Sequence, residues 1–360
     1  MTLPTTMKAM VTMGHGGLEQ MVFHTDWPRP EPTKGEVLIK VGACGLNNTD
    51  VNTRSGWYSK AVTEATTGGA FVEVGEDDPT WGGAPITFPR IQGADVCGMI
   101  VAVGGGVDPT RIGERVITDG WLRDVADPTN MDKTGYFGSE RDGGFSEYTT
   151  TPARNALVVK SNLSDAELAT FSCSYSTAEG MLIRAQVSRA DTVLVPGASG
   201  GVGGALVQLA KRRGARVIAM ASHAKHKEVD ALGPDKILHR APKNLRVALD
   251  DEKVTVVADI VGGPYWPNLI DILERGGRYT CSGAIAGPMV ELDLRTFYLR
   301  DLTFTGSTVI MPEVMLNLIR YIERGEVKPA LAATYPLDQL HDAQTAFIAK
   351  KHTGNIVVCP

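Results

Sequence analysis

A glycine-dense turn between an apolar segment and a helical segment constrains the fold of this chain more than any other feature. The segment reads Val193-Leu-Val-Pro-Gly-Ala-Ser-Gly-Gly-Val-Gly-Gly204, and a helix is expected to continue over Ala205–Arg213. Glycine tolerates positive φ and lets backbone approach a ligand closely, and a helix N-terminus offers free N–H groups to a phosphate. The pattern therefore predicts a dinucleotide-binding turn, with a simple tight turn as the alternative. The residues expected to contact the cofactor here are Ala198, Ser199, Gly200, Gly201, Val202 and Gly203.

The second half of the chain alternates short apolar segments with amphipathic helical ones. This alternation predicts βαβ units, a parallel sheet and an α/β fold class. The first 160 residues favour short strands separated by turn signals, so we expect a β-rich first domain. A last strand at Asn355–Val358 is expected to pack back on that domain. The strands expected in the parallel sheet are Thr192–Val195, Arg216–Ala221, Val254–Ile260, Gly277–Ser282 and Leu302–Thr305.

The end of the second of these strands bears on the choice of cofactor. An acid commonly binds the ribose 2′-hydroxyl of NAD at this position. Here the chain continues Ser222-His-Ala-Lys-His-Lys227, and the first carboxylate is Glu228. A hydroxyl with two lysines and two histidines suits a 2′-phosphate, so NADPH is expected, in contact with Ser222 and Lys225. A solvated helix start is the alternative. The residues expected on the nicotinamide side, at the carboxyl ends of later strands, are Gly262, Ala284 and Ile285.

Composition excludes several classes of function. The 360 residues suit two domains, and 36 Lys+Arg against 41 Asp+Glu give a formal charge of −5. This acidic balance argues against a nucleic-acid partner or an anionic membrane surface. No apolar segment approaches the roughly 18 residues of a membrane span, and the first ten residues lack a signal-peptide core, so a cytoplasmic location is expected.

The cysteines and histidines restrict the chemistry further. The five cysteines are odd in number and scattered, which favours reduced thiols over a disulfide framework. No histidine lies between His24 and His223. Any catalytic apparatus in that long segment must therefore work without imidazole.

Short motifs spread over nearly the whole chain form a recognisable set. They are Cys44-Gly-Leu-Asn-Asn-Thr-Asp50, Gly93-Ala-Asp-Val-Cys-Gly98, Gly113-Glu-Arg-Val116, Gly143-Gly-Phe-Ser-Glu-Tyr148, Thr177-Ala178, Asp259-Ile-Val-Gly-Gly263, Gly306-Ser-Thr308 and Gly354-Asn-Ile356. Together they resemble the medium-chain dehydrogenase/reductase superfamily. The resemblance implies a GroES-like catalytic domain over residues 1–160, completed by residues 312–360, and a Rossmann NADP-binding domain over residues 161–311. It also implies an active site in the cleft and a homodimer formed through Leu302–Thr308.

The zinc alcohol dehydrogenases of this superfamily use a cysteine in the first motif and a His-Glu pair in the second. Here Asn47 stands at the cysteine position, and Ala94-Asp95 replaces the His-Glu pair. Only Cys173 falls where a thiolate ligand would sit, whereas a catalytic zinc needs three protein ligands. We therefore expect no metal, and interpret Cys173 as a buried small hydrophobe rather than a ligand.

The remaining pattern resembles the zinc-independent quinone oxidoreductase (zeta-crystallin-like) branch. Those enzymes carry an asparagine at the Asn47 position and a tyrosine after an Arg-Ser-Gly turn, which matches Arg54-Ser-Gly-Trp-Tyr58. The chain departs from that pattern at Asn48, where proline is common. It also departs at Asn355, where a lysine often precedes the last strand; Asn355 is still expected to contact the cofactor.

Without a metal, an activated alkene or a quinone is an easier hydride acceptor than a simple carbonyl, because neutral donors can stabilise the developing oxyanion. The resemblance implies that Asn47 and Tyr58 supply these donors, while Thr49 and Thr177 orient substrate or nicotinamide. Asp50 is interpreted as structural. The alternatives are an alcohol dehydrogenase with unconventional zinc ligands and an NADPH-binding protein with little turnover. The segments 57–92 and 119–143 are expected to shape the pocket, the first as a lid or as a surface loop.

Overall fold

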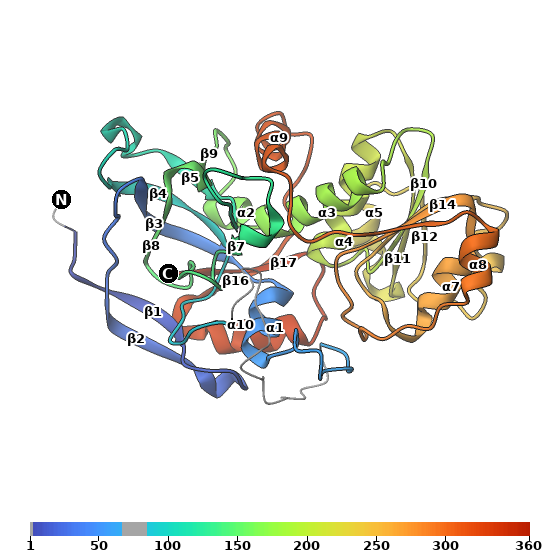
Figure 1. Cartoon of the computed structure of the whole chain (residues 1–360), viewed down its shortest axis with the longest axis horizontal. Coiled ribbons are helices and arrows are strands. Elements are labelled where there is room, and N and C mark those ends of the chain that lie inside the picture. Colours follow the sequence, from blue (N-terminus) through green and yellow to red (C-terminus); the bar gives the residue numbers. More distant parts are fainter. Residues whose placement is uncertain (1–2, 67–84) are drawn as a thin grey trace.

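Two β-sheets organise the molecule. The computed structural model describes residues 3–66 and 85–360. The sheets lie toward opposite ends of the long axis, and the helix α3 (Ser172–Arg184) lies between them (Figure 1). The expected α/β architecture is confirmed. The extra segment whose role as a lid was left open, with Phe71, Trp81 and the acidic patch, falls mostly outside the described residues.

The second sheet is entirely parallel and follows the order β12-β11-β10-β13-β14-β15. Counted along the chain this is 3-2-1-4-5-6, the order of a Rossmann fold, so a crevice forms where the order reverses beside β10. β12 was not among the expected strands. The strands are β10 (Thr192–Pro196), β11 (Arg216–Ala221), β12 (Lys236–His239), β13 (Val254–Asp259), β14 (Leu273–Cys281) and β15 (Thr303–Gly306).

Helices cover both faces of this sheet. Successive residues of β10 point to opposite sides: Val193 and Val195 pack with α3 and α4, whereas Leu194 packs in a separate cluster with Leu249 and Trp266. Burial on both faces explains why these strands read as continuous apolar segments. The helices that accompany the sheet are α4 (Gly201–Arg212), α5 (His226–Asp230), α6 (Leu245–Leu249), α7 (Trp266–Asp271), α8 (Leu294–Leu299) and α9 (Pro312–Glu323).

The first sheet has seven strands in the order β16-β17-β3-β4-β5-β9, with β8 paired to β3. The expected return of the last strand is confirmed, because Val357 and Val358 of β17 lie opposite Gly45 and Cys44 of β3. The C-terminal segment thus completes the N-terminal sheet. Its strands are β3 (Glu36–Gly45), β4 (Asp95–Val103), β5 (Arg115–Thr118), β8 (Tyr148–Pro152), β9 (Ala156–Val158), β16 (Leu331–Pro336) and β17 (Asn355–Cys359).

The remaining elements are smaller and accompany both sheets. The two hairpin-like pairs are β1 (Thr6–Thr12) with β2 (Met21–Pro28) and β6 (Trp121–Leu122) with β7 (Gly135–Tyr136). The helices are α1 (Asn48–Ser55), α2 (Asp165–Leu168) and α10 (Leu340–Ile348). The 3-10 turns are η1 (Leu18–Gln20), η2 (Pro109–Arg111), η3 (Met131–Lys133), η4 (Ala153–Asn155), η5 (His223–Lys225), η6 (Gly263–Tyr265) and η7 (Leu337–Gln339). Within the described ranges no helix is long and apolar enough to cross a membrane.

Candidate active site and cofactor cleft

A backbone hydrogen bond within the glycine turn after β10 holds its two sides together. Gly197 has φ of +69°, and its carbonyl accepts the N–H of Gly200 at 3.0 Å. A Cβ on Gly203 would lie 2.1 Å from the same carbonyl oxygen, so α4 packs directly on the turn. The first N–H groups of α4 have no partner within the helix and point out of this turn. The geometry fits a pyrophosphate at the N-terminus of α4.

The C-terminal segment is hydrogen-bonded to this turn. The Gly354 N–H donates to the Ser199 carbonyl at 2.9 Å. The side chain of Asn355 is buried; its Oδ1 accepts the Ser174 hydroxyl at 3.0 Å and its Nδ2 donates to the Thr170 carbonyl at 3.3 Å. Asn355 thus lies at the expected site, with both polar atoms of its side chain held by the protein. Its expected contact with the cofactor stays a prediction.

Basic groups converge where β11 ends. Ser222 caps η5, and the Lys225 ammonium donates to the carbonyls of Lys350 and His352 at 2.7 and 2.5 Å. The Lys350 ammonium donates to Asn48 Oδ1 at 2.9 Å. Burial and the nearby charge of Lys225 lower the pKa of Lys350 to about 7. Burial and the charges of Lys350 and Lys225 lower the pKa of His352 to about 4. The sequence pointed to Ser222 and Lys225 but not to Lys350 or His352, which reach the site from the other end of the chain.

The residues expected on the nicotinamide side lie at the carboxyl ends of β13 and β14. Gly262 has φ of +60°, and a Cβ there would lie 3.2 Å from the Ala284 side chain. The Thr66 N–H, from the N-terminal part of the chain, donates to the Ile285 carbonyl at 3.1 Å. The three residues expected on the nicotinamide side are therefore together. The Asp259 carboxylate orders this turn by accepting the Gly262 N–H.

Asn47 is the N-cap of α1, a helix that was not predicted. Its N–H donates to Asp50 Oδ2 at 2.8 Å, and Asp50 Oδ1 accepts the Gly93 N–H at 3.2 Å. These bonds support the structural interpretation of Asp50. Burial raises the pKa of this carboxyl group to about 7. The Thr49 Oγ1 atom beside the cap is buried without a hydrogen-bond partner in the described part of the chain, and the buried Asn47 side chain acts on Asp95. Buried polar groups are normally satisfied, so the Thr49 hydroxyl is a candidate to bind a ligand.

Asp95 and Cys173 lie next to Asn47. The Cys173 N–H, near the start of α3, donates to Asp95 Oδ1 at 2.9 Å. Burial raises the pKa of Asp95 to about 8, although the Asn47 side chain and the Cys173 N–H oppose the shift. Burial and the nearby Asp95 raise the pKa of the Cys173 thiol to about 12, although Tyr136 and Thr177 beside the sulfur oppose the shift. Cys173 is therefore a neutral thiol, and Tyr136, which the sequence did not single out, completes the cluster.

Tyr58 lies two residues after Gly56, the C-cap of α1, which has φ of +71°. The side chain is 40% exposed, and desolvation of its hydroxyl raises the pKa of the phenol well above its usual value. The Asn52 side chain opposes this shift, whereas Cys173 and Asp50 add to it. The phenol is thus neutral and carries a proton in the same cluster as Asn47 and Cys173.

The residues at the zinc position do not fit a catalytic zinc. Ala94, at the histidine position, has an apolar side chain and is 2% exposed. Within residues 3–66 and 85–360, no three or more His, Cys, Asp or Glu side chains are grouped so that they could hold a metal. Zinc requires three protein ligands around its open position, and the pair Cys173–Asp95 supplies two at most.

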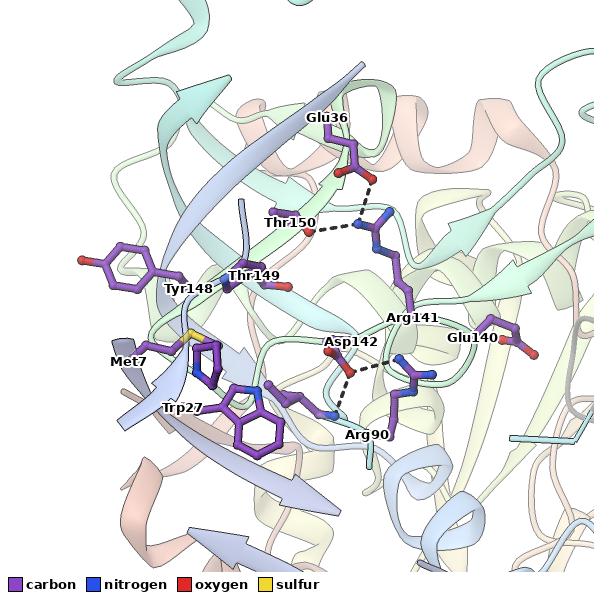
Figure 2. A pocket seen from close by; sticks show the side chains of 14 residues that line it. Met7, Trp27, Glu36, Arg90, Glu140, Arg141, Asp142, Tyr148, Thr149 and Thr150 are labelled. Carbon is purple, nitrogen blue, oxygen red and sulfur yellow. Dashed lines mark hydrogen bonds and ion pairs between the residues drawn. The ribbon is translucent and has the colours of Figure 1, made fainter. Parts of the chain in front are cut away.

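A separate cavity of about 400 Å³ opens beside β2, β3 and β8. Figure 2 shows two ion pairs among its lining side chains: Arg141 with Glu36 at 2.9 Å and Arg90 with Asp142 at 3.0 Å. Trp27 forms part of its wall. None of the candidate catalytic and cofactor-binding residues lines this cavity, but Arg90, Ile91 and Glu140 to Gly143 belong to the two segments expected to shape the pocket.

Comparison with known proteins identifies the family. Residues 33–161 match the alcohol dehydrogenase GroES-like domain, and residues 201–324 match the zinc-binding dehydrogenase family. The chain is 27% identical to the chloroplastic NADPH-dependent alkenal/one oxidoreductase of Arabidopsis thaliana, covering 100% of this chain and 81% of that protein. It is 26% identical to the quinone oxidoreductase of Rattus norvegicus, over 95% and 94% of the two chains. A crystal structure described as a "putative alcohol dehydrogenase" from Sinorhizobium meliloti 1021 superposes with a TM-score of 0.90 at 45% identity, over 99% of this chain and 98% of that chain.

Proposed function

The chain belongs to the medium-chain dehydrogenase/reductase superfamily and is an oxidoreductase. From this premise we propose that it reduces a quinone or the C=C bond of an α,β-unsaturated carbonyl. We propose further that it uses NADPH and no catalytic zinc. Relatives in this superfamily bind nicotinamide cofactors, and the turn after β10 fits one. The finer choices of cofactor, acceptor and metal rest on the residues of this chain.

The choice of NADPH is supported by the charges at the end of β11. Lys225 and Lys350 approach one another: the Lys225 ammonium binds carbonyl oxygens, and the Lys350 ammonium binds the Asn48 side chain and lies over the Phe347 ring. The lowered pKa of Lys350 reflects burial beside that second cation. Buried cations are stabilised by an anion, and a 2′-phosphate brings a dianion to this place.

The choice of a C=C or quinone acceptor rests on one observation above all: a buried neutral amide, Asn47, lies beside Asp95 and the unpartnered Thr49 hydroxyl where zinc dehydrogenases hold a metal ligand. The cofactor, when bound, supplies a hydride. In this proposal Asn47 Nδ2 and the Thr49 hydroxyl hydrogen-bond the acceptor oxygen as it gains charge. An enolate or hydroquinone oxygen needs only such neutral donors, whereas an alkoxide from a simple ketone needs stronger help.

Tyr58 is the proposed source of the final proton. A phenol keeps its proton at neutral pH, so Oη can donate to an enolate or hydroquinone oxygen. Thr177, beside Cys173 on α3, is proposed to orient the nicotinamide.

The proposal is tested by NADPH oxidation over matched acceptors: a quinone, a linear enone, an enoyl-CoA ester, and the saturated aldehyde and ketone of the same chain length. We expect oxidation with the quinone or one of the conjugated acceptors, slower oxidation with NADH, and a saturated carbonyl as the enone product. Turnover of the saturated aldehyde or ketone alone would contradict the proposal.

An alcohol dehydrogenase is the second candidate, favoured by the likeness to the Sinorhizobium meliloti structure at 45% identity. In that case zinc would bind through Cys173, Asp95 and a ligand outside the family positions. The acceptor series above distinguishes the two candidates, because the second predicts reversible oxidation of the saturated alcohol.

A homodimer is also proposed, through the outer edge of β15. This strand is the last in the parallel sheet, so one side of it has no neighbour within the described chain. Leu294, Tyr298 and Leu299 of the nearby α8 are each more than half exposed, which suits a covered surface. Sedimentation equilibrium should give twice the chain mass of 38.5 kDa, and a monomer at all concentrations would contradict this.

A further inference from the structure

Three histidine rings meet at the carboxyl edge of the parallel sheet. His223 begins η5 directly after β11, His226 begins α5, and His239 ends β12. The centroid of the His223 ring lies 4.8 Å from that of His226 and 4.9 Å from that of His239. β12 pairs in parallel with β11 so that His239 lies opposite Ala221, the last residue of β11.

Most of the nitrogens on these rings have no protein partner. His226 Nε2 lies 3.3 Å from the Ala221 carbonyl, and His239 Nδ1 accepts the Ala241 N–H at 3.4 Å. In the part of the chain that the structure describes, both nitrogens of His223 and one on each other ring make no further hydrogen bond. The rings are exposed or half-buried, so a ligand can reach them.

The charges around the rings favour an anion. Lys225 lies between His223 and His226 in the sequence, and both Arg240 and Glu228 act on its ammonium. Lys227 is exposed on α5, and Lys350 approaches from the C-terminal segment. Glu228 is the one carboxylate that acts on Lys225, so cations outnumber it here.

This position corresponds to a defined part of a bound dinucleotide. The end of the second strand of a Rossmann sheet faces the ribose of the adenosine half, where the 2′-substituent is read. We propose that His223 and His239, with His226 behind them, hydrogen-bond the 2′-phosphate of NADPH and set the preference for NADPH over NADH. The inference rests on the proposed use of NADPH. It adds His239, on a strand the sequence did not reveal, and assigns the imidazoles as direct contacts beside Ser222 and Lys225.

The test measures binding without turnover. Kd values for NADPH, NADH and adenosine 2′,5′-bisphosphate are determined by calorimetry for the wild type, His223→Asn, His239→Asn and the control Lys253→Gln. Loss of one hydrogen bond to a phosphate should weaken NADPH and the bisphosphate about tenfold in each histidine variant. NADH should be unaffected by any variant. The control removes an exposed positive charge at the amino end of β13, away from the carboxyl edge of the sheet, and should leave all three Kd values unchanged.

Three results would overturn the inference. Equal losses for NADPH and NADH would make the histidines structural. Unchanged NADPH binding would remove them from the phosphate site. Stoichiometric Zn²⁺ or Ni²⁺ binding that disappears in the same variants, with NADPH unaffected, would make the cluster a metal site. Enone turnover by the wild type is measured separately. If the wild type reduces no enone but the histidine variants selectively lose affinity for NADPH, the inference holds and the proposed reaction is wrong.

Discussion

Replacing Gly203 with alanine should destroy the cofactor turn without unfolding the protein. The added Cβ would lie 2.1 Å from the Gly197 carbonyl oxygen, 0.9 Å inside the 3.0 Å limit that real Cβ atoms respect. It would also lie 2.8 Å from the Gly197 carbonyl carbon and 2.9 Å from Ala198 Cα. All three atoms are backbone, so no side chain can rotate away. The turn must therefore move by about 1 Å, and the N–H groups of α4 lose their alignment with a phosphate.

The size of the effect follows from those N–H groups. Two hydrogen bonds to a charged group at about 1.5 kcal/mol or more each amount to about 3 kcal/mol, which is a Kd raised at least about 100-fold. NADPH Kd is measured by quenching of protein fluorescence, with circular dichroism as the check on folding.

The adjacent glycine provides a matched control. A Cβ on Gly204 meets only the end of the Leu232 side chain at 3.2 Å and the Ala198 carbonyl oxygen at 3.6 Å. Gly204→Ala should keep NADPH binding and raise the free energy of unfolding by up to about 1 kcal/mol, because alanine is the better helix former. If Gly203→Ala binds NADPH as tightly as Gly204→Ala, the assignment of this turn to the pyrophosphate is refuted.

Three further substitutions test other parts of the molecule. Tyr58→Phe should lower kcat for an enone about 100-fold while NADPH Kd stays constant, since a general acid is lost; an unchanged kcat/KM would remove Tyr58 from the reaction. Asp95→Asn should change the pH dependence of stability. The pKa of Asp95 in the folded protein is raised from 3.8 to about 8, so the wild type loses stability as pH rises through this range and the variant loses less. The free energy of unfolding in urea, measured at pH 5 and pH 8, should therefore fall further in the wild type than in the variant. An equal fall in both proteins would contradict the raised pKa. Glu179→Ala should lower the free energy of unfolding by about 3 kcal/mol, because Glu179, 4% exposed, binds Arg213 through two bonds of 2.8 Å and its loss leaves a partly buried cation unpaired; a loss below 1 kcal/mol on thermal or urea unfolding would show that water replaces the carboxylate.

The parallel sheet was readable from sequence because its strands are buried on both faces. β11 occupies the expected range Arg216–Ala221, and β10 differs from the expected range only at its last residue. β12 was missed because Lys236–His239 is short and half polar, and its place is fixed by pairing with β11 rather than by its own pattern.

The first domain was harder to read because its local signals are ambiguous. The segment from Asn47 to Asp50 reads as a turn, since asparagine and aspartate favour turns and helix caps alike. The capping bond from the Asn47 N–H to Asp50 and the left-handed Gly56 make it a helix instead. The helix buries the Asn47 amide beside Asp95, which spacing alone could not show.

The site residues that the sequence missed come from distant parts of the chain. Tyr136 reaches Cys173 from the short strand β7, and Lys350 reaches Lys225 across 125 positions. Lysines near a chain end are ordinarily solvated, so nothing in the sequence distinguishes Lys350 from Lys351. Only the fold brings the C-terminal segment under the cofactor turn.

The claim that a hydride acceptor is activated here by neutral donors, without zinc, is tested most directly on one purified sample. Metal content is measured by mass spectrometry, and NADPH oxidation by an enone is followed before and after dialysis against a chelator. We predict zinc well below one atom per chain and a rate that dialysis leaves unchanged. Stoichiometric zinc, with activity lost on its removal and restored on its return, would contradict it.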